Sequence, residues 1–497
     1  MLTRSEFQVL YDQGADASFA LFQELEDRFT SRLNELESRL LQISVQLSRD
    51  SHNSSKPPSS DGLRKKPAPQ NLRTKSGKSS GGQPNHRGVT LCLTDALCDP
   101  LALAETVSRF PSVCSECHNS LDGVASDGFE RRQVYDLPPL ALQITEHRAY
   151  RTVCPHCNVR NRASFPPEVT QPVQYGPHVK ALCVYLQEYQ LLPYARTQEL
   201  LSDLFGCSLC EGTLGNSLAT CYARLAPVES AIKAALQSGE VGHFDETGVR
   251  IEGKLHWLHS ASTAALTFYA AHAKRGKEAT DAIGVLPAFT GTAVHDAYAT
   301  YFGYDCAHAL CNAHLLRELI GLSEEAKQQS PSPSPGWPSK LIDLLMRGKQ
   351  HVENAQSQGK KHLSTEVLNT FETQYDALVT EGKEANPPAP PSEKRGRTRQ
   401  SPAYNLLERL RQHRESVLAF LYHFKVPFDN NQAERDLRMT KVRQKISGCF
   451  RSAEGARIFC RIRGYISTLR KQGKHVLTAL QNVFQGNPTM PDLLPGQ

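Results

Sequence analysis

The chain has 497 residues and a net charge of +6, with 39% hydrophobic and 22% charged residues. This length exceeds the ~250–300 residues at which one core usually stops growing, so we expect several domains. No apolar run approaches the ~20 residues that span a bilayer, and Met1 to Glu24 lack the basic start and apolar core of a signal peptide. We therefore expect a soluble, cytoplasmic protein with no membrane partner, whose 14 cysteines are reduced or bind metal.

Apolar residues near the N-terminus follow the spacing of a heptad repeat. The residues on this seam are Phe22, Leu25, Phe29, Leu33, Leu36, Leu40, Ile43 and Leu47. The spacing predicts a coiled coil over residues 16–52 and a homo-oligomer, and the alternative is an amphipathic helix packed on its own domain. Prolines and small polar residues from Asn53 to Ser60 end the helix.

A basic linker is expected over residues 53–90. From Gly62 to Thr94 the chain carries several Lys and Arg residues and no Asp or Glu. This composition suits a polyanion such as DNA, and a solvated linker is the alternative. The DNA contacts predicted here are Arg64, Lys65 and Lys66.

Two Cys-x-x-Cys pairs follow, Cys114 with Cys117 and Cys154 with Cys157. The stretch between them contains two segments that read as strands, residues 132–137 and 142–144. Four thiolates match the tetrahedral preference of structural zinc. The pairs therefore predict a zinc-ribbon DNA-binding module over residues 91–170 that holds Zn²⁺. A third pair, Cys207 and Cys210, is assigned to core packing.

Helical patterning occupies residues 171–238. One helix is expected over Arg196–Phe205 and another over Glu211–Leu225, with a break at Gly206. Two helices around a glycine turn are typical of a helix-turn-helix reader of DNA. A helical connector without DNA contacts is the alternative.

After Gly239 the apolar period changes from helical to alternating. The elements expected are strands at Val241–Asp245, Leu255–Ser260, Leu266–Ala271 and Thr292–His295, a turn near Glu252, and helices at Lys277–Leu286 and His314–Leu322. This order fits a multidomain α/β protein with a ribonuclease H-like core over residues 239–450. The polar, proline-rich residues 324–400 look like an insertion around a helical stretch. Helices resume over Asn405–Tyr422 and after Asn431, and residues 451–497 form a basic helical C-terminal region.

Three carboxylates of this core are candidate metal ligands. Asp245 closes the first predicted strand, Asp296 follows a later strand, and Glu434 comes from a helix. Phosphodiester cleavage and transfer use two divalent ions about 4 Å apart, which carboxylates from separate elements can hold. Oxygen ligands favour Mg²⁺ or Mn²⁺. The alternatives are a turn at Asp245, a helix cap at Asp296 and a capping box at Glu434.

The residues around and after Glu434 are strongly basic. From Lys425 to Lys474 there are thirteen Lys or Arg residues against four acidic ones, in a helical pattern. We expect a folded basic face that contacts phosphates beside the metal ligands, and a solvated helix face is the alternative. The predicted DNA contacts are Arg435, Arg438, Lys441, Arg443 and Lys445.

A set of short motifs is ordered along residues 16–487. They are Asn53–Asp61, Gly81–Pro84, Arg132–Pro139, Asp245–Gly248, His295–Tyr298, Cys311–His314, Asp429–Arg435 and Ser447–Gly448. In this order they resemble the large transposase subunit of the insertion sequence 66 family, a group of DDE transposases. The resemblance implies a coiled coil, a zinc ribbon, and a ribonuclease H-like domain with Asp245, Asp296 and Glu434 as its triad.

The chain departs from the family's usual motifs at Asn85 and Asn312, and neither departure challenges activity. Cys311 and His314 lie between the second and third carboxylates, as a Cys-x-x-His pair does in several DDE groups. With Cys306 and His308 nearby, these residues are a further zinc candidate, against the alternative of a buried structural pairing.

The resemblance implies a bacterial, nucleoid-associated enzyme. Such an enzyme binds the terminal inverted repeats of its element, cleaves the DNA ends and joins the freed 3′-hydroxyl to target DNA. It also implies accessory proteins from the same element. A catalytically inactive DNA-binding regulator and a ribonuclease H-like nuclease without strand transfer are the alternatives. The intact triad argues against the first, and the second would not need the coiled coil, ribbon and reader.

Overall fold

A computed structural model describes residues 8, 11, 12, 14–48, 53, 106–137, 140–329, 336–391 and 398–493. The chain divides into two units. One comprises Met1–Pro67, His147–Ser202 and Ser208–Gln497, and the other comprises Ala68–Glu146 and Asp203–Cys207. The predicted DNA contacts Arg64, Lys65 and Lys66 lie outside the described residues. No helix in the described ranges is long and apolar enough to cross a membrane.

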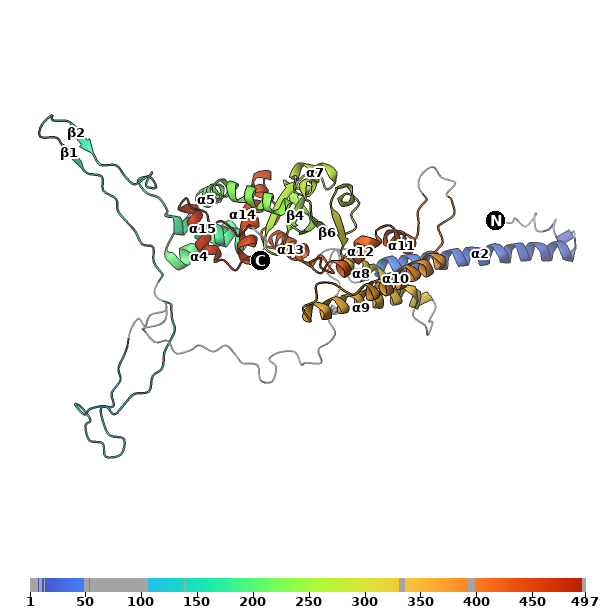
Figure 1. The fold of residues 1–497 in the computed structure, drawn as a ribbon, viewed down its shortest axis with the longest axis horizontal. Coiled ribbons are helices and arrows are strands. Elements are labelled where there is room, and N and C mark those ends of the chain that lie inside the picture. The colour runs from blue at the N-terminus through green and yellow to red at the C-terminus, as the bar shows by residue number, and fades with distance from the viewer. Residues whose placement is uncertain are drawn as a thin grey trace. The chain divides into compact units, whose positions relative to one another are not determined.

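The N-terminal helix α2 spans Ala15–Ser48 as one uninterrupted rod (Figure 1). It confirms the helix predicted for this stretch. Its apolar residues are open to solvent in the single chain, with Phe22 69%, Phe29 70% and Leu40 66% exposed. The packed-helix alternative therefore stays open beside the coiled coil. The pairing of these residues with a second helix stays a prediction.

Each Cys-x-x-Cys pair lies in a small β structure. Strands β1 (Arg151–Val153) and β2 (Arg160–Arg162) form an antiparallel hairpin around the second pair. A single bridge between Val113 and Ser120 encloses the first pair. The strands predicted at residues 132–137 and 142–144 are wrong, because these segments have no strand assignment. Their apolar side chains, such as Val134 and Ile144, are exposed, so no buried face exists to favour pairing.

A group of helices precedes the main sheet. They are α3 (Pro177–Val184), the π-helical turn η2 (Tyr185–Tyr189), α4 (Tyr194–Phe205), α5 (Glu211–Arg224) and α6 (Ala226–Gln237). The two helices predicted around Gly206 are confirmed, and this glycine has a φ of +62°, which an L side chain adopts with strain. Of the third cysteine pair, Cys207 is buried as expected, whereas Cys210 is exposed.

The central sheet has five strands in the order β5-β4-β3-β6-β7. The strands are β3 (Val241–Ile251), β4 (Lys254–Ser262), β5 (Thr267–His272), β6 (Thr292–His295) and β7 (Ala307–Leu310). The first three pair antiparallel, whereas β3, β6 and β7 run parallel. Glu252 and Gly253 both have positive φ, which makes the tight β3–β4 turn expected there.

Short helical elements connect the strands. Helix α7 (Lys277–Ile283) ends before its predicted limit because Gly284 adopts a left-handed conformation. The 3₁₀ turns η3 (Leu286–Ala288) and η4 (Tyr301–Gly303) follow on either side of β6. Strand β7 was not expected from the sequence.

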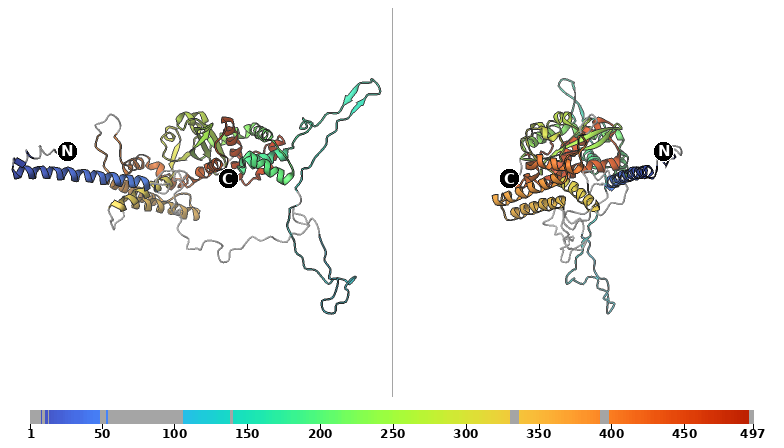
Figure 2. Two further views of the ribbon diagram at one scale, coloured as in Figure 1. Left: turned by 180° about the vertical axis from the view of Figure 1, so that it is seen from behind. Right: turned by 90° about the vertical axis from the view of Figure 1, so that its right-hand side faces the viewer.

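The predicted insertion is helical and has its own core. Its helices are α9 (Trp337–Ser357) and α10 (Thr365–Ala385), which pack with α8 (Asn312–Gln329), α11 (Pro402–Gln412) and α12 (Arg414–Tyr422). Leu341, Phe371, Tyr375 and Leu407 lie in this core. Figure 2 shows these helices side by side from two further directions.

Three helices follow at the C-terminal end of the fold, and the first two pack on the sheet. They are α13 (Asn431–Ser447), α14 (Ala453–Lys471) and α15 (Val476–Phe484). Helix α13 packs on β3 and β4, and α14 packs on β5 (Figure 1). A core of Leu258, Tyr269, Leu437 and Phe459 joins these helices to the strands. Because α13 carries Glu434, this packing brings the third carboxylate to the sheet.

Candidate active site

The sheet register brings Asp245 and Asp296 together. Strands β3 and β6 pair in parallel with His243 beside Val294, and the same offset carries Asp245 opposite Asp296, directly after β6. Asp245 lies inside β3 and does not end it, because β4 continues to pair with this strand as far as Ile251. The prediction that Asp245 closes its strand is therefore wrong, as is the alternative of a turn residue.

Glu434 lies in the first turn of α13, as expected. The capping-box alternative is wrong, because the N-cap is Asn430, whose side chain makes no capping hydrogen bond, and Glu434 is the fourth helical residue. Oε1 of Glu434 is instead 3.8 Å from Nε2 of His314 and 3.9 Å from Nη2 of Arg317, both on α8. Helix α8 therefore presents cationic or polar groups to the third carboxylate.

The carboxylates lie close enough to repel one another. Burial raises the pKa of Asp245 well above its usual value, and the charges of Glu246, Asp296 and Glu434 raise it further. Asp245 thus senses both other members of the predicted triad. A concentration of negative charge that raises the pKa of a carboxyl group is an environment that a bound cation would relieve.

The donor atoms suit a hard cation, although they are not gathered around a point. Three carboxylates offer the oxygen ligands that Mg²⁺ and Mn²⁺ prefer. Within the described part of the chain, no group of three or more His, Cys, Asp and Glu side chains is arranged to hold a metal ion. The further zinc candidate is used otherwise, because Cys311 accepts a hydrogen bond from the Asn430 amide and His308 contacts His295.

Asn430 fastens the start of α13 to the strand that carries Asp245. The side chain is buried, and its Nδ2 donates to the Phe244 carbonyl at 2.9 Å. Its Oδ1 accepts from Nδ1 of His243 at 2.8 Å. The sequence motif around Asn430 was noticed, but no role for this residue was predicted.

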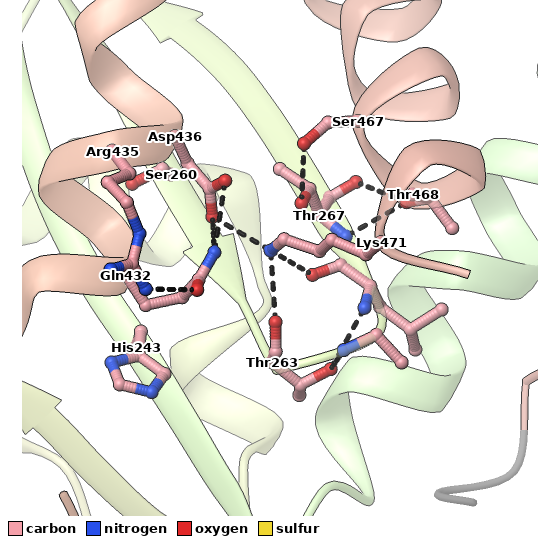
Figure 3. A network of polar contacts seen from close by, with 12 residues as sticks. His243, Ser260, Thr263, Thr267, Gln432, Arg435, Asp436, Ser467, Thr468 and Lys471 are labelled. Carbon is pink, nitrogen blue, oxygen red and sulfur yellow. Dashed lines mark hydrogen bonds and ion pairs between the residues drawn. The ribbon is translucent and has the colours of Figure 1, made fainter. Parts of the chain in front are cut away.

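A second polar network holds α13 just beyond Glu434 (Figure 3). Asp436 is buried and lies 2.8 Å from Nζ of Lys471 on α14. Lys471 also donates to the carbonyl groups of Thr263 and Leu266, and Gln432 donates to Asp436. Burial lowers the pKa of Lys471, and Asp436 opposes this effect. The network joins α13, α14 and the β4–β5 connection.

The predicted phosphate contacts on α13 separate into two groups. Arg435, Arg438 and Lys445 are exposed. In contrast, Nζ of Lys441 donates to the Gly248 carbonyl at 2.7 Å. The Arg443 guanidinium lies 3.9 Å from the Phe450 ring centre. Burial lowers the pKa of Arg443, and the negative charge of the buried Glu188 opposes this effect. Both side chains are therefore engaged within the protein rather than presented to a ligand.

The two cysteine pairs have the same local geometry. The Cys114 amide donates to the Asn119 carbonyl, and the Cys154 amide donates to the Val159 carbonyl. Backbone amides that point at the sulfur atoms lower the pKa of both first cysteines. The largest effect on Cys114 comes from the amide of Cys117, and the largest effect on Cys154 comes from the amide of His156. Each loop therefore favours a thiolate, the form that binds metal. Cys114 and Cys117 belong to one unit, and Cys154 and Cys157 belong to the other.

Fold and site together define a mixed α/β protein with a cluster of carboxylates beside its parallel strands. Residues 172–458 match the model of the Transposase IS66 family, and residues 111–158 match the zinc-finger binding domain of transposase IS66. The chain belongs to the IS66 transposase family. Residues 8–91 match a family of unknown function. No curated protein matches the chain.

Proposed function

We propose that this chain is a DDE-type transposase that binds the terminal inverted repeats of its insertion sequence, cleaves the DNA and transfers the strand. One observation supports the proposal: the β3–β6 register, continued two residues past His243 and Val294, aligns Asp245 with Asp296, and the charge of Glu434 helps to raise the pKa of Asp245. In a chain of the IS66 transposase family, this supports a triad with one carboxylate from strand β3, one from the residue after β6 and one from helix α13. Three antiparallel strands followed by two parallel ones support a ribonuclease H-like core.

The residues of the site have distinct roles in this proposal. Asp245, Asp296 and Glu434 would hold Mg²⁺ or Mn²⁺, which activates the attacking oxygen and stabilises the leaving oxygen in phosphodiester transfer. A bound cation would oppose the burial and the neighbouring charges that raise the pKa of Asp245. His314 and Arg317 orient Glu434 from α8.

Exposed cations on α13 extend the site toward the DNA. Arg435 and Arg438 project from the helix that carries Glu434 and contact backbone phosphates of the bound strand. Lys445 lies further along the same helix and adds to this basic face. The half-buried Lys441 and Arg443, which are engaged within the protein, are not part of the proposal.

The N-terminal half supplies DNA-end binding and assembly. We assign Zn²⁺ to Cys114, Cys117, Cys154 and Cys157, supported by the zinc-finger match and by amides that favour both thiolates. The ribbon of residues 91–170, the helices of residues 171–238 and the basic linker of residues 53–90 bind the DNA ends. Helix α2 pairs with a second copy, because its exposed apolar seam is otherwise left in water.

The test is joining of a labelled, pre-cleaved transposon end to target DNA in Mg²⁺, beside a gel shift on the same DNA. Glu434→Gln keeps shape but removes a charge, so we expect joining to be lost and end binding to remain. Glu415→Gln, on an exposed position of α12, is the matched control and should join normally.

The outcomes separate the three functions considered. Near-normal joining by Glu434→Gln removes this residue from the site and contradicts the proposed triad. The same assay on an uncleaved labelled end reports cleavage as well, and a wild-type chain that binds this end but neither cleaves nor joins it is a regulator. Cleavage without joining indicates a nuclease.

A further inference from the structure

Arg275 lies beside the carboxylates and is not part of the predicted triad. It belongs to the loop between β5 and α7, where residues 272–277 include Lys274 and Lys277 and no acidic residue. Nε and Nη2 of Arg275 are both 2.6 Å from Oε1 of Glu246, the residue after Asp245. The loop thus places a basic segment at the edge of an acidic site.

Two aromatic rings hold the Arg275 guanidinium. Its central carbon lies 4.8 Å from the Trp257 ring centre and 4.2 Å from that of Tyr298. Glu246 is itself anchored, because its second oxygen accepts a hydrogen bond from the Tyr301 hydroxyl. Ring contacts and a buried partner fix the plane of the guanidinium before any ligand arrives, so little conformational entropy is lost on binding.

One edge of the guanidinium remains available. Nη1 of Arg275 makes no hydrogen bond within the described residues and is not a buried atom. The Arg275 side chain is 38% exposed, whereas that of Glu246 is 1% exposed. A residue that served only as a counter-ion for Glu246 has no need of an exposed, oriented donor edge.

This edge lies within the electrostatic range of the active site. Burial opposes the charge of Arg275, but Glu246 and then Asp296 outweigh burial and raise its pKa. Tyr298, which covers the guanidinium, follows Asp296 in the chain, and its amide donates to the Asp296 carboxylate. Arg275 and the second triad carboxylate are therefore parts of one local structure.

We infer that Arg275 binds a backbone phosphate of the DNA strand next to the scissile phosphate. The inference rests on the proposed function, because it needs a DNA strand across the carboxylates. A planar guanidinium matches a phosphate with two parallel hydrogen bonds, which a lysine ammonium does not reproduce. The phosphate accepts hydrogen bonds from the edge of the Arg275 guanidinium that does not face Glu246.

The experiment combines single-phosphate neutralisation with an Arg275 variant. Pre-cleaved ends carry one methylphosphonate at successive positions counted from the 3′-hydroxyl that cleavage leaves, and their affinity for the full chain is measured in Mg²⁺ without target DNA. For the wild type we expect one position at which affinity falls on the order of tenfold, the effect of one charge-assisted hydrogen bond. Arg275→Lys keeps a charge beside Glu246 and should be insensitive at that position.

Two variants serve as controls. Arg461→Lys is matched to the test variant, because Arg461 also lies over a ring, Tyr222 at 3.7 Å, and pairs with a carboxylate, Glu229. It should retain the wild-type pattern. Trp257→Leu leaves the Glu246 pair intact but loosens the guanidinium, so we expect an intermediate sensitivity. It also provides a second result if Arg275→Lys folds poorly.

The salt dependence of end binding gives an independent measurement. Loss of one phosphate contact should reduce the slope of log affinity against log salt by about 0.9. If Arg275→Lys shows the wild-type methylphosphonate pattern and slope, Arg275 is only a counter-ion for Glu246 and the inference is wrong. A wild-type chain that joins ends yet senses no phosphate beside the scissile one also overturns it. A wild type that neither binds nor joins ends contradicts the proposed function itself.

Discussion

Replacement of Asn430 by alanine tests how the site is held together. The side chain is 2% exposed and makes two hydrogen bonds, with His243 and with the Phe244 carbonyl. Each bond contributes about 1 kcal/mol, and a buried group left without its partner costs about 1–3 kcal/mol. Because water partly enters the space left by the side chain, we expect Asn430→Ala to lower the free energy of unfolding by about 3 kcal/mol.

The same change should impair catalysis in the molecules that remain folded. Asn430 is the N-cap of α13, so its loss frees the helix start that sets the position of Glu434. A misplacement of about 1 Å at a reacting centre lowers the rate about a hundredfold. We therefore expect the rate of strand joining per folded molecule to fall about a hundredfold, whereas end binding persists.

The assay pairs urea unfolding with joining at a temperature where every variant is folded. Asn312→Ala is the matched control, because Asn312 is 1% exposed and donates to the Val417 carbonyl at 3.1 Å. It should lose about 1–2 kcal/mol of stability by the same reasoning and join at the normal rate when folded. Wild-type joining per folded molecule by Asn430→Ala would refute the positioning role.

Three further predictions concern the metals, the assembly and pH. The purified chain should contain about one zinc ion, and Cys114→Ser or Cys154→Ser should each abolish it in metal analysis; retained zinc contradicts the ribbon. Leu36→Asp with Leu40→Asp should convert an oligomer into monomers in sedimentation, and unchanged sedimentation contradicts the coiled coil. The raised pKa of Asp245 means that the folded chain binds a proton more tightly than the unfolded chain. Metal-free stability should therefore fall as pH rises from the ordinary carboxyl range through this raised pKa, and Asp245→Asn should remove the fall and gain roughly 0.5–2 kcal/mol. Mn²⁺ affinity should rise over the same pH window, and pH-independent binding in titration calorimetry contradicts the assignment.

Local patterns in the sequence predicted much of the fold. Alternating residues gave the hairpin of β3 and β4, and Glu252 with Gly253 marked its turn. The end of β3 was misplaced because Asp-Glu-Thr-Gly favours turns locally, whereas pairing with β4 keeps it extended. Strand β7 was missed because it has only four residues, so its apolar pattern is too short to recognise.

The site was predicted only where short motifs carry its residues. Asp245, Asp296 and Glu434 each lie in a recognisable motif, and their role came from the family resemblance. Asn430 and Lys471 were not predicted because their partners are remote in sequence, with His243 and Asn430 separated by 187 positions. The ring contact of Arg443 was not predicted for a similar reason, since a basic helical pattern does not show that one of its members lies over Phe450.

The structure also distinguishes the two acidic residues in the first turns of α13. Glu434 and Asp436 are two positions apart, so they point to different sides of the helix. Asp436 is neutralised by Lys471 at 2.8 Å and fixes the helix to α14. Glu434 has only longer contacts, at 3.8 and 3.9 Å, and contributes to the charge that raises the pKa of Asp245. A carboxylate whose charge is already compensated gains little from a metal ion, whereas one that repels its neighbours gains much. The balance of charge therefore supports the proposal that Glu434 is the metal ligand and that Asp436 has a structural role.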